Sequence, residues 1–301
     1  MAGVHELQLS TPDRQRADRA AAAAIADVHR IEAKYSRYRD DSVTSAINRA
    51  AGGAAVAIDG ETASLLRYAD RCHAQSGGRF DITSGVLRRA WDFRRRPPRI
   101  PSPDEIDEAR ALIGWDRVEW SDAAVRLPRA GMELDFGGIG KEYAADRAAV
   151  ICRDLGIAHA LVNLGGDVRA IGPRADGSPW RVGIRDPRCD DATIAHILLD
   201  DAAVATSGDY ERYIEVEGRR YCHLLDPRTG QPVSRWQSVS VAAPLAILAG
   251  SYATIAMLLE GDAKPFLETL DVPYLMVAQD GSATVRGASG TSAAFVVGRT
   301  K

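Results

Sequence analysis

Three glycines and a lysine stand close together in the segment DFGGIGKEYAAD, which begins at Asp135. Loops of this kind hold phosphate groups through backbone amides at the start of a helix, and a lysine adds positive charge. The segment nevertheless fits neither standard nucleotide motif. A P-loop needs glycine five residues before Gly140 and Ser or Thr directly after Lys141, where this chain has Asp135 and Glu142. The dinucleotide pattern G-x-G-x-x-G fails because Tyr143 stands where its last glycine belongs.

Further segments of the chain also combine glycine with polar residues that can bind a ligand. They are residues 35–42, 77–83, 163–167, 206–210 and 223–230. Glycine allows a ligand to approach the backbone closely, and backbone amides there can hold phosphate oxygens. Any one of these segments alone, such as LGGD or DPRTG, is an ordinary turn sequence. Their combination in this order and spacing therefore carries the functional signal.

In that combination the chain resembles the ApbE family of FAD:protein FMN transferases, from about Met1 to its end. The resemblance rests on YSRYRDDSVTSAIN, GGRFDITSGVLRRAWDF, LDFGGIGK, LVNLGGDVRAIG, ATSGDYERY, HLLDPRTGQPV and SYATIAMLLEG. It implies an α+β fold of mixed, largely antiparallel sheets with packed helices, which binds FAD in an extended crevice. It also implies a reaction: with Mg²⁺, the FMN half of FAD is transferred to a Ser or Thr hydroxyl of a target flavoprotein subunit, and AMP is released.

The resemblance implies roles for individual residues as well. Catalysis would rest on His223 as general base or proton relay and on Lys141 as a point charge beside the phosphates. The residues expected around FAD are Tyr38, Phe80, Asp81, Asp135, Lys141, Ser207, Gly208, His223 and Leu224. Structural alternatives stay open for three of them: His223 bonding only the neighbouring turn, Phe80 belonging to the core, and Asp81 capping a turn.

The expected metal site contains one departure from the family pattern. Its residues by resemblance are Gly138, Gly250, Ala253 and Thr254. The family pattern Asp-Ala-x-x-Thr places a carboxylate where this chain has Gly250, so we expect weakened Mg²⁺ binding, because Mg²⁺ usually takes one or two carboxylates. If this position limits the site, Gly250→Asp should raise activity. Glu142 stands where the family commonly has glycine, and we hypothesise that it substitutes in part for the missing ligand. A glutamate in the first turn of a helix is also favoured by the helix dipole alone.

Two other functions remain open on these residues. A flavin-binding protein with a degenerate metal site could act as a carrier, regulator or assembly partner. An FAD pyrophosphatase would use water in place of the acceptor hydroxyl. An enzyme is favoured by four residues that match the family pattern: Lys141, Asp135, His223 and Thr254. Gly250, which departs from that pattern, favours the binding protein.

Both helices and strands must position these residues. Apolar spacing predicts helices over residues 13–34, 61–78 and 141–157, and a strand leading into a buried helix over 238–262. We place Ile25 on the apolar face of the first helix and Val150 on that of the helix after the glycine loop. Strands outnumber clean βαβ units, which favours an α+β fold. The chain shows no internal repeat or linker, so we expect a single domain over residues 1–301.

The composition excludes several classes of partner and compartment. A net charge of −3 provides no basic field for nucleic acid, and no apolar stretch is long enough to cross a membrane. The four cysteines are widely spaced and form no CxxC pair, which argues against a zinc site or a disulfide framework. The N-terminal residues show no export signal. We therefore expect a cytoplasmic protein whose partners are FAD and a flavoprotein subunit.

Overall fold

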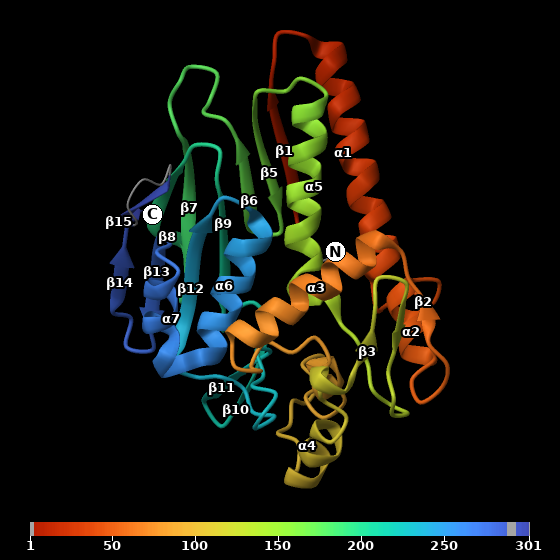
Figure 1. Cartoon of the computed structure of the whole chain (residues 1–301). Helices are drawn as coiled ribbons and strands as arrows, with labels where there is room; N and C mark the ends of the chain where they lie inside the picture. The colour runs from red at the N-terminus through yellow and green to blue at the C-terminus, as the bar shows by residue number, and fades with distance from the viewer. Residues whose placement is uncertain (1–2, 288–292, 301) are drawn as a thin grey trace.

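The computed structural model describes residues 3–287 and 293–300 and has an α+β architecture, as predicted (Figure 1). Its largest sheet has seven strands in the order β1-β5-β6-β9-β12-β13-β14, and each neighbouring pair is antiparallel. The strands are β1 (His5–Ser10), β5 (His159–Leu164), β6 (Asp167–Ile171), β9 (Ala203–Gly208), β12 (Trp236–Ala243), β13 (Tyr274–Ala278) and β14 (Ala283–Arg286).

Three smaller antiparallel sheets complete the strand structure of the described residues. One contains β2 (Val56–Ala57), β4 (Ala124–Arg126) and β3 (Glu119–Trp120). Another contains β15 (Ala293–Thr300), β8 (Cys189–Leu199) and β7 (Trp180–Asp186). The last is the pair β10 (Tyr213–Val216) and β11 (Arg219–Cys222).

Two groups of helices cover the large sheet. In Figure 1, α1 and α5 run side by side next to β1 and β5, while α6 packs on β9 and β12. The α-helices are α1 (Arg14–Tyr35), α2 (Val43–Arg49), α3 (Gly60–Gln75), α4 (Pro103–Arg110), α5 (Gly140–Asp154), α6 (Ala246–Leu259) and α7 (Ala263–Thr269). No helix in residues 3–287 or 293–300 is long and apolar enough to cross a membrane.

Close packing of α1 against α5 relies on alanine rather than on larger side chains. Ala20 and Ala24 of α1 are 0% and 1% exposed, whereas Ile25 is 50% exposed and Val150 is 40% exposed. The predictions for Ile25 and Val150 are therefore wrong. Ile25 follows Ala24 directly, so it is rotated by about 100° from the buried stripe. The same rotation separates Val150 from the buried Ala149.

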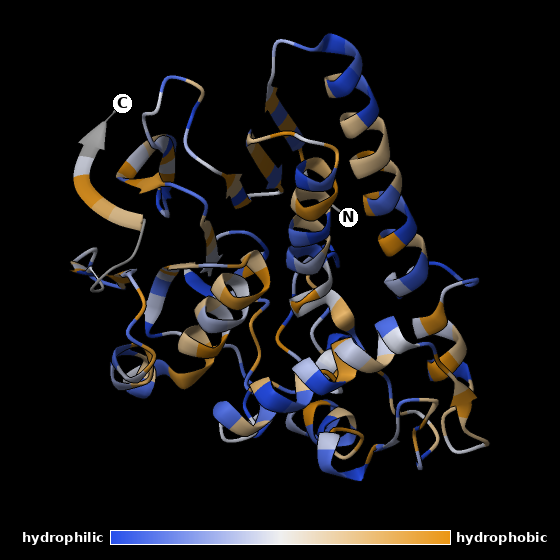
Figure 2. Cartoon of the chain, turned by 45° about the horizontal axis from the view of Figure 1, so that its top comes forward, coloured by the Kyte–Doolittle hydropathy of each residue, from blue (hydrophilic) through white to orange (hydrophobic). Residues whose placement is uncertain are grey.

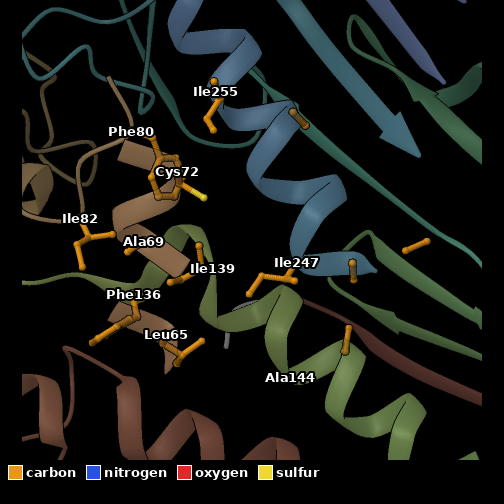
Figure 3. Packing of buried hydrophobic residues seen from close by; sticks show 14 of the residues in the cluster. Leu65, Ala69, Cys72, Phe80, Ile82, Phe136, Ile139, Ala144, Ile247 and Ile255 are labelled. Atoms are coloured by element: carbon orange, nitrogen blue, oxygen red, sulfur yellow. The ribbon is translucent and has the colours of Figure 1, made fainter. Parts of the chain in front are cut away.

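A shared hydrophobic core holds α5 and α6 in place. Figure 2 colours α6 mostly tan, orange and white, whereas α1 alternates between blue and tan, as expected for a buried and a half-exposed helix. Figure 3 shows buried side chains of three helices gathered in one cluster: Leu65, Ala69 and Cys72 of α3, Ile139 and Ala144 at α5, and Ile247 and Ile255 of α6. These helices carry several of the residues predicted for the site.

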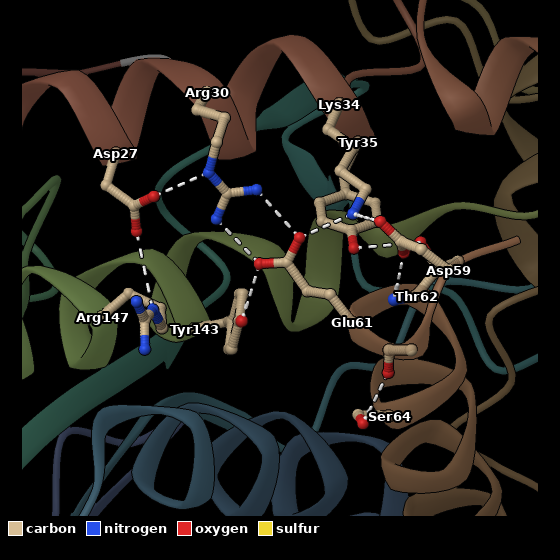
Figure 4. A network of polar contacts seen from close by, with 11 residues as sticks. Asp27, Arg30, Lys34, Tyr35, Asp59, Glu61, Thr62, Ser64, Tyr143 and Arg147 are labelled. Atoms are coloured by element: carbon tan, nitrogen blue, oxygen red, sulfur yellow. Dashed lines mark hydrogen bonds and ion pairs between the residues drawn. The ribbon is translucent and has the colours of Figure 1, made fainter.

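A polar network joins α1, α3 and the start of α5 (Figure 4). Glu61 accepts hydrogen bonds from both terminal nitrogens of Arg30 at 2.8 Å, from Lys34 at 2.6 Å and from the Tyr143 hydroxyl at 2.8 Å. Arg30 also donates to Asp27 at 2.6 Å. Partly exposed ion pairs add little stability, so the main effect of this network is to fix Tyr143, next to Glu142, in position.

Asp146 fixes the position of α6 relative to α5. Both of its carboxylate oxygens accept backbone N–H bonds at the start of α6, from Ala246 at 2.8 Å and Ile247 at 2.9 Å. Leu245, the residue that precedes this helix, has no side-chain group to cap it. The cap of α6 therefore comes from α5, in which Asp146 lies four residues after Glu142.

Removing this cap should destabilise the fold. We expect Asp146→Ala to lower the free energy of unfolding by about 1–3 kcal/mol, because two buried N–H groups lose their acceptor. Urea unfolding followed by circular dichroism measures this change. Asp154→Ala, at an exposed position of the same helix, is the matched control and should stay within about 0.5 kcal/mol of wild type. Equal stabilities of the two variants would contradict the capping role.

Candidate active site

One cleft of about 1970 Å³ runs past the ends of several elements. Its walls come from the end of α1, residues 79–98, the start of α5, the β5–β6 turn, β9, β10 and α6. Small-molecule sites usually have volumes of roughly 300–1,000 Å³, so this cleft has room for a ligand as large as a dinucleotide. A second cavity, of about 420 Å³, lies beside β10 and β11 and contains none of the predicted site residues.

The structure brings almost all predicted site residues to this cleft. They are Tyr38, Phe80, Asp81, Asp135, Gly138, Lys141, Ser207, Gly208, His223, Leu224, Gly250 and Thr254. Ala253 does not line this cleft: it is 0% exposed and packs in the hydrophobic core. Gly250 and Thr254 are four residues apart and share a face of α6, whereas Ala253 is rotated toward the core.

The glycine loop forms a 3-10 turn, Phe136–Gly138, that leads directly into α5. Asp135 caps this turn by accepting a backbone N–H bond at 2.9 Å, and it forms an ion pair with Arg37. A Cβ at Gly138 would lie 3.3 Å from Phe80 Cζ, so the glycine lets the loop pass close to that ring. The first residues of α5 line the cleft, and the positive end of the helix dipole there favours an anionic ligand.

Lys141 lies in the first turn of α5 beside two carboxylates. Its Nζ is 2.5 Å from Asp167 Oδ2, and Asp167 is buried. Burial alone would lower the pKa of the lysine, but the charges of Asp167 and Glu142 outweigh that effect and raise the pKa. Lys141 is therefore a stable cation, suited to neutralising a phosphate oxygen.

Glu142 is a buried carboxylate of the cleft that forms no ion pair within residues 3–287 and 293–300. The residue is 7% exposed, and its Oε2 has no hydrogen-bond partner among the described residues. Burial first, and then the charge of Asp167, raise the pKa of Glu142 to about 8, against the opposing charge of Lys141. Burying a carboxylate oxygen that accepts no hydrogen bond costs free energy of folding unless a ligand binds to that oxygen. The described ranges contain no group of three His, Cys, Asp or Glu side chains that could hold a metal.

His223 lines the cleft directly after β11. Its Nδ1 lies 3.1 Å from the Arg212 carbonyl oxygen, and because a carbonyl only accepts, Nδ1 carries the proton. Nε2 is then an unprotonated acceptor. Burial above all, together with the charge of Arg212, lowers the pKa of His223 to about 4. The imidazole is therefore neutral at neutral pH and can take a proton from a ligand.

The lowered pKa predicts an unusual pH profile. A base works in its unprotonated form, which His223 loses only as the pH falls toward about 4, whereas an ordinary histidine loses it near 6.5. We expect the acid limb of kcat/KM for FAD, which reports groups of the free enzyme, to lie near pH 4 and to disappear in His223→Gln. Circular dichroism should confirm that the fold persists over this range. An acid limb centred near pH 6.5 would contradict the assignment.

Hydroxyl groups from β9 and α6 meet in the cleft. Ser207 Oγ and Thr254 Oγ1 are 2.8 Å apart, so each holds the other in place. The adjacent Gly208 is required by packing, because a Cβ there would lie 2.4 Å from Tyr210 Cε1. The Tyr210 ring in turn lies under the Arg185 guanidinium, 4.8 Å from its central carbon. This corner of the cleft therefore offers neutral oxygen ligands held by rigid neighbours.

Tyr38 presents an exposed ring at the cleft. It is 62% exposed, and the guanidinium carbons of Arg37 and Arg94 lie 4.9 and 5.4 Å from its ring centroid. Burial raises the pKa of Tyr38, but the hydrogen bond from Arg37 and the charges of both arginines outweigh this and lower it. The exposed ring can stack on a planar ligand, so the role expected for Tyr38 stays a prediction.

Phe80 and Asp81 line the cleft and also make contacts within the protein. Phe80 is 5% exposed and belongs to the core, although its ring edge reaches the cleft. Asp81 Oδ1 accepts bonds from Thr83 N at 2.7 Å and Thr83 Oγ1 at 2.6 Å, and Oδ2 accepts from Trp115 N at 3.1 Å. Both oxygens of Asp81 are thus engaged within the protein, and its main role is to shape this turn.

Sequence reasoning missed the partners of the site residues. Arg37 pairs with Asp135, Asp167 pairs with Lys141, and the Arg212 carbonyl orients His223. Asp167 belongs to the LGGD segment, and a buried acid in a ligand-binding loop is a usable signal. The other two partners offered none, because only the fold brings them together.

Solved structures with a similar fold include ApbE proteins. One is the ApbE protein of Thermotoga maritima, which is 35% identical, with a TM-score of 0.84 over 94% of this chain and 96% of the other. Another is the flavin transferase ApbE of Vibrio cholerae, which is 27% identical, with a TM-score of 0.82 over 95% of this chain and 97% of the other.

The ApbE family model matches residues 2–276, and the chain belongs to the ApbE family. A Vibrio cholerae relative named FAD:protein FMN transferase is 31% identical over 256 residues, which cover 83% of this chain and 76% of the relative. A Salmonella typhimurium relative of the same name is 34% identical over 232 residues, which cover 74% of this chain and 66% of the relative.

Proposed function

We propose that this protein transfers FMN from FAD to a Ser or Thr hydroxyl of a target flavoprotein subunit and releases AMP. The observation that carries the proposal is the presence, in one cleft, of a neutral histidine with an unprotonated Nε2, a permanent lysine cation and the start of a helix. Membership of a family whose relatives are named FAD:protein FMN transferase supports it.

The reaction needs few chemical groups from the protein. The acceptor oxygen forms a bond to the phosphorus of the FMN half, and the bond from that phosphorus to the AMP oxygen breaks. The acceptor proton passes to His223 Nε2, and AMP leaves with the electron pair of the broken bond. Lys141 and the amides at the start of α5 balance the charge on the phosphate oxygens. The Tyr38 ring is available to stack on the flavin or the adenine.

The residues present also fit a divalent cation. Glu142 provides a buried carboxylate oxygen without a partner, Thr254 a hydroxyl and Gly138 a carbonyl. Hard oxygen ligands of this kind suit Mg²⁺, which when bound neutralises charge on the phosphate oxygens of the nucleotide. Mg²⁺ dependence is therefore part of the proposal.

An assay for AMP separates this function from its alternatives. The protein is incubated with FAD, Mg²⁺ and a recombinant flavoprotein subunit, and a second sample contains the same subunit with its acceptor threonine changed to alanine. AMP formed only with the intact acceptor, together with a matching gain in acceptor mass, supports transfer. AMP formed without any acceptor supports a pyrophosphatase, and no AMP in any sample supports a flavin-binding protein.

We also propose that the protein works in the cytoplasm as a single domain. All four of its cysteines are free, which suits a reducing compartment. One core cluster takes residues from α1, α3, α5, α6 and β13, so distant parts of the chain depend on one another. Cooperative unfolding, with one transition seen by two different probes, would support the single domain.

A further inference from the structure

Glu142 occupies the space that a side chain at position 250 would fill. A Cβ built on Gly250 would lie 2.6 Å from Glu142 Cγ, 3.0 Å from Cδ and 2.9 Å from Oε1. At contacts under 3.0 Å one of the two groups must shift, and here the atoms in the way all belong to the Glu142 side chain. A larger residue at this point of α6 therefore requires Glu142 to leave the space that it occupies.

Glycine in the interior of α6 calls for such an explanation. It costs about 1 kcal/mol relative to alanine in a helix, and Gly250 is buried between well-packed neighbours. The capping contact between Asp146 and Ala246 lies one helical turn away on both helices, since Asp146 follows Glu142 by four residues and Gly250 follows Ala246 by four. The capping contact thus fixes α5 and α6 relative to each other at the point where the Glu142 side chain lies beside Gly250.

We propose that Glu142 provides the carboxylate ligand of the divalent cation in this protein, with Thr254 Oγ1 and the Gly138 carbonyl oxygen as further ligands. This inference rests on the proposed function. It adds that the carboxylate ligand comes from α5, whereas the hydroxyl ligand comes from α6. Three observations carry it: Glu142 is 7% exposed, its Oε2 has no partner among the described residues, and it fills the space beside Gly250, one turn before Thr254.

Asp167 does not take this role, because its carboxylate is paired with Lys141. A cation beside Glu142 would bind its unpartnered Oε2 and offset the repulsion between Glu142 and Asp167. The sequence alone predicted a weakened site, in which the carboxylate at position 250 is missing and Glu142 substitutes for it only in part. The geometry leads to a different expectation, in which one carboxylate is present and has moved to the neighbouring helix.

This inference reverses the expectation for Gly250→Asp. The new side chain would collide with Glu142 and would place a third acid beside Asp167, so we expect this variant to bind the cation no better than wild type and to be less stable. The double variant Glu142→Gly with Gly250→Asp removes the collision and returns one carboxylate to the same space. We expect it to recover cation binding that Glu142→Gly alone loses.

The test measures Mn²⁺ binding without FAD, by electron paramagnetic resonance of free Mn²⁺, with Mg²⁺ as competitor. We expect Glu142→Gln, which keeps the shape of the side chain, to weaken binding more than about tenfold. Mg²⁺ should raise the melting temperature of wild type but not of this variant. Glu215→Gln, a change to an exposed acid of the same cleft, is the matched control and should bind as wild type does.

The outcomes separate this inference from the proposed function. Equal Mn²⁺ binding by wild type and Glu142→Gln, or no saturable binding by wild type, overturns the inference even if FMN transfer is observed. Binding that depends on Glu142 in a protein that never releases AMP supports the inference and overturns the transfer reaction. If the double variant is folded but does not bind Mn²⁺, the result also counts against the inference. A carboxylate in the space between Glu142 and Gly250 would then not be enough to bind the cation.

Discussion

His223→Gln is expected to lower kcat for FMN transfer by about 100- to 10,000-fold, the range for loss of a general base. Glutamine can still donate to the Arg212 carbonyl, which His223 Nδ1 reaches at 3.1 Å, but it cannot accept a proton at neutral pH. The local turn is therefore kept while the base is lost. The KM for FAD should change much less than kcat, because the acceptor proton moves only during the reaction.

His159 provides the matched control for this prediction. Its Nδ1 lies 2.8 Å from the Pro173 carbonyl oxygen, so it has the same kind of bond, but it does not line the cleft. His159→Gln should leave kcat within about twofold of wild type. If His223→Gln transfers FMN at the wild-type rate, His223 only supports the turn, which is the structural alternative that the sequence left open.

The sequence predicted well those features that depend on local pattern. The helix at residues 13–34 follows from alanine content and apolar spacing, and the strand leading into a buried helix near the C-terminus follows from hydrophobicity. The glycine segments come together in one cleft because each lies at the end of a strand or helix. The fold class, and the gathering of most predicted site residues at one cleft, were accessible from the sequence for this reason.

Features that depend on contacts between distant segments were not accessible. Gly250 looked like the loss of a ligand, and Glu142 was a hypothetical substitute for it, because the sequence does not show that the Glu142 side chain lies beside Gly250. Asp146, in an ordinary helical sequence, gave no sign that it caps α6, 100 residues away. Ala253 was assigned by motif spacing, but a helix turns every residue by about 100°, and this one faces the core.

Lys141→Met is expected to lower kcat/KM for FAD by about 100- to 1,000-fold, the usual cost of losing one preorganised charge at a phosphate or oxyanion. Methionine is an unbranched side chain one atom shorter than lysine, and it carries no charge. The change also leaves Asp167, which is 3% exposed, without its cation and close to Glu142. A loss of stability would therefore accompany the loss of activity, because an unpaired buried carboxylate is costly.

A double variant separates these two effects. Lys141→Met combined with Asp167→Asn removes both charges of the pair, so we expect urea unfolding to show that most of the lost stability returns. Activity should stay low, because the phosphate oxygens still lack the cation. Recovery of AMP release in the double variant would mean that Lys141 serves only to neutralise Asp167, and the charge on the nucleotide would then have to be balanced by the helix amides and the divalent cation alone.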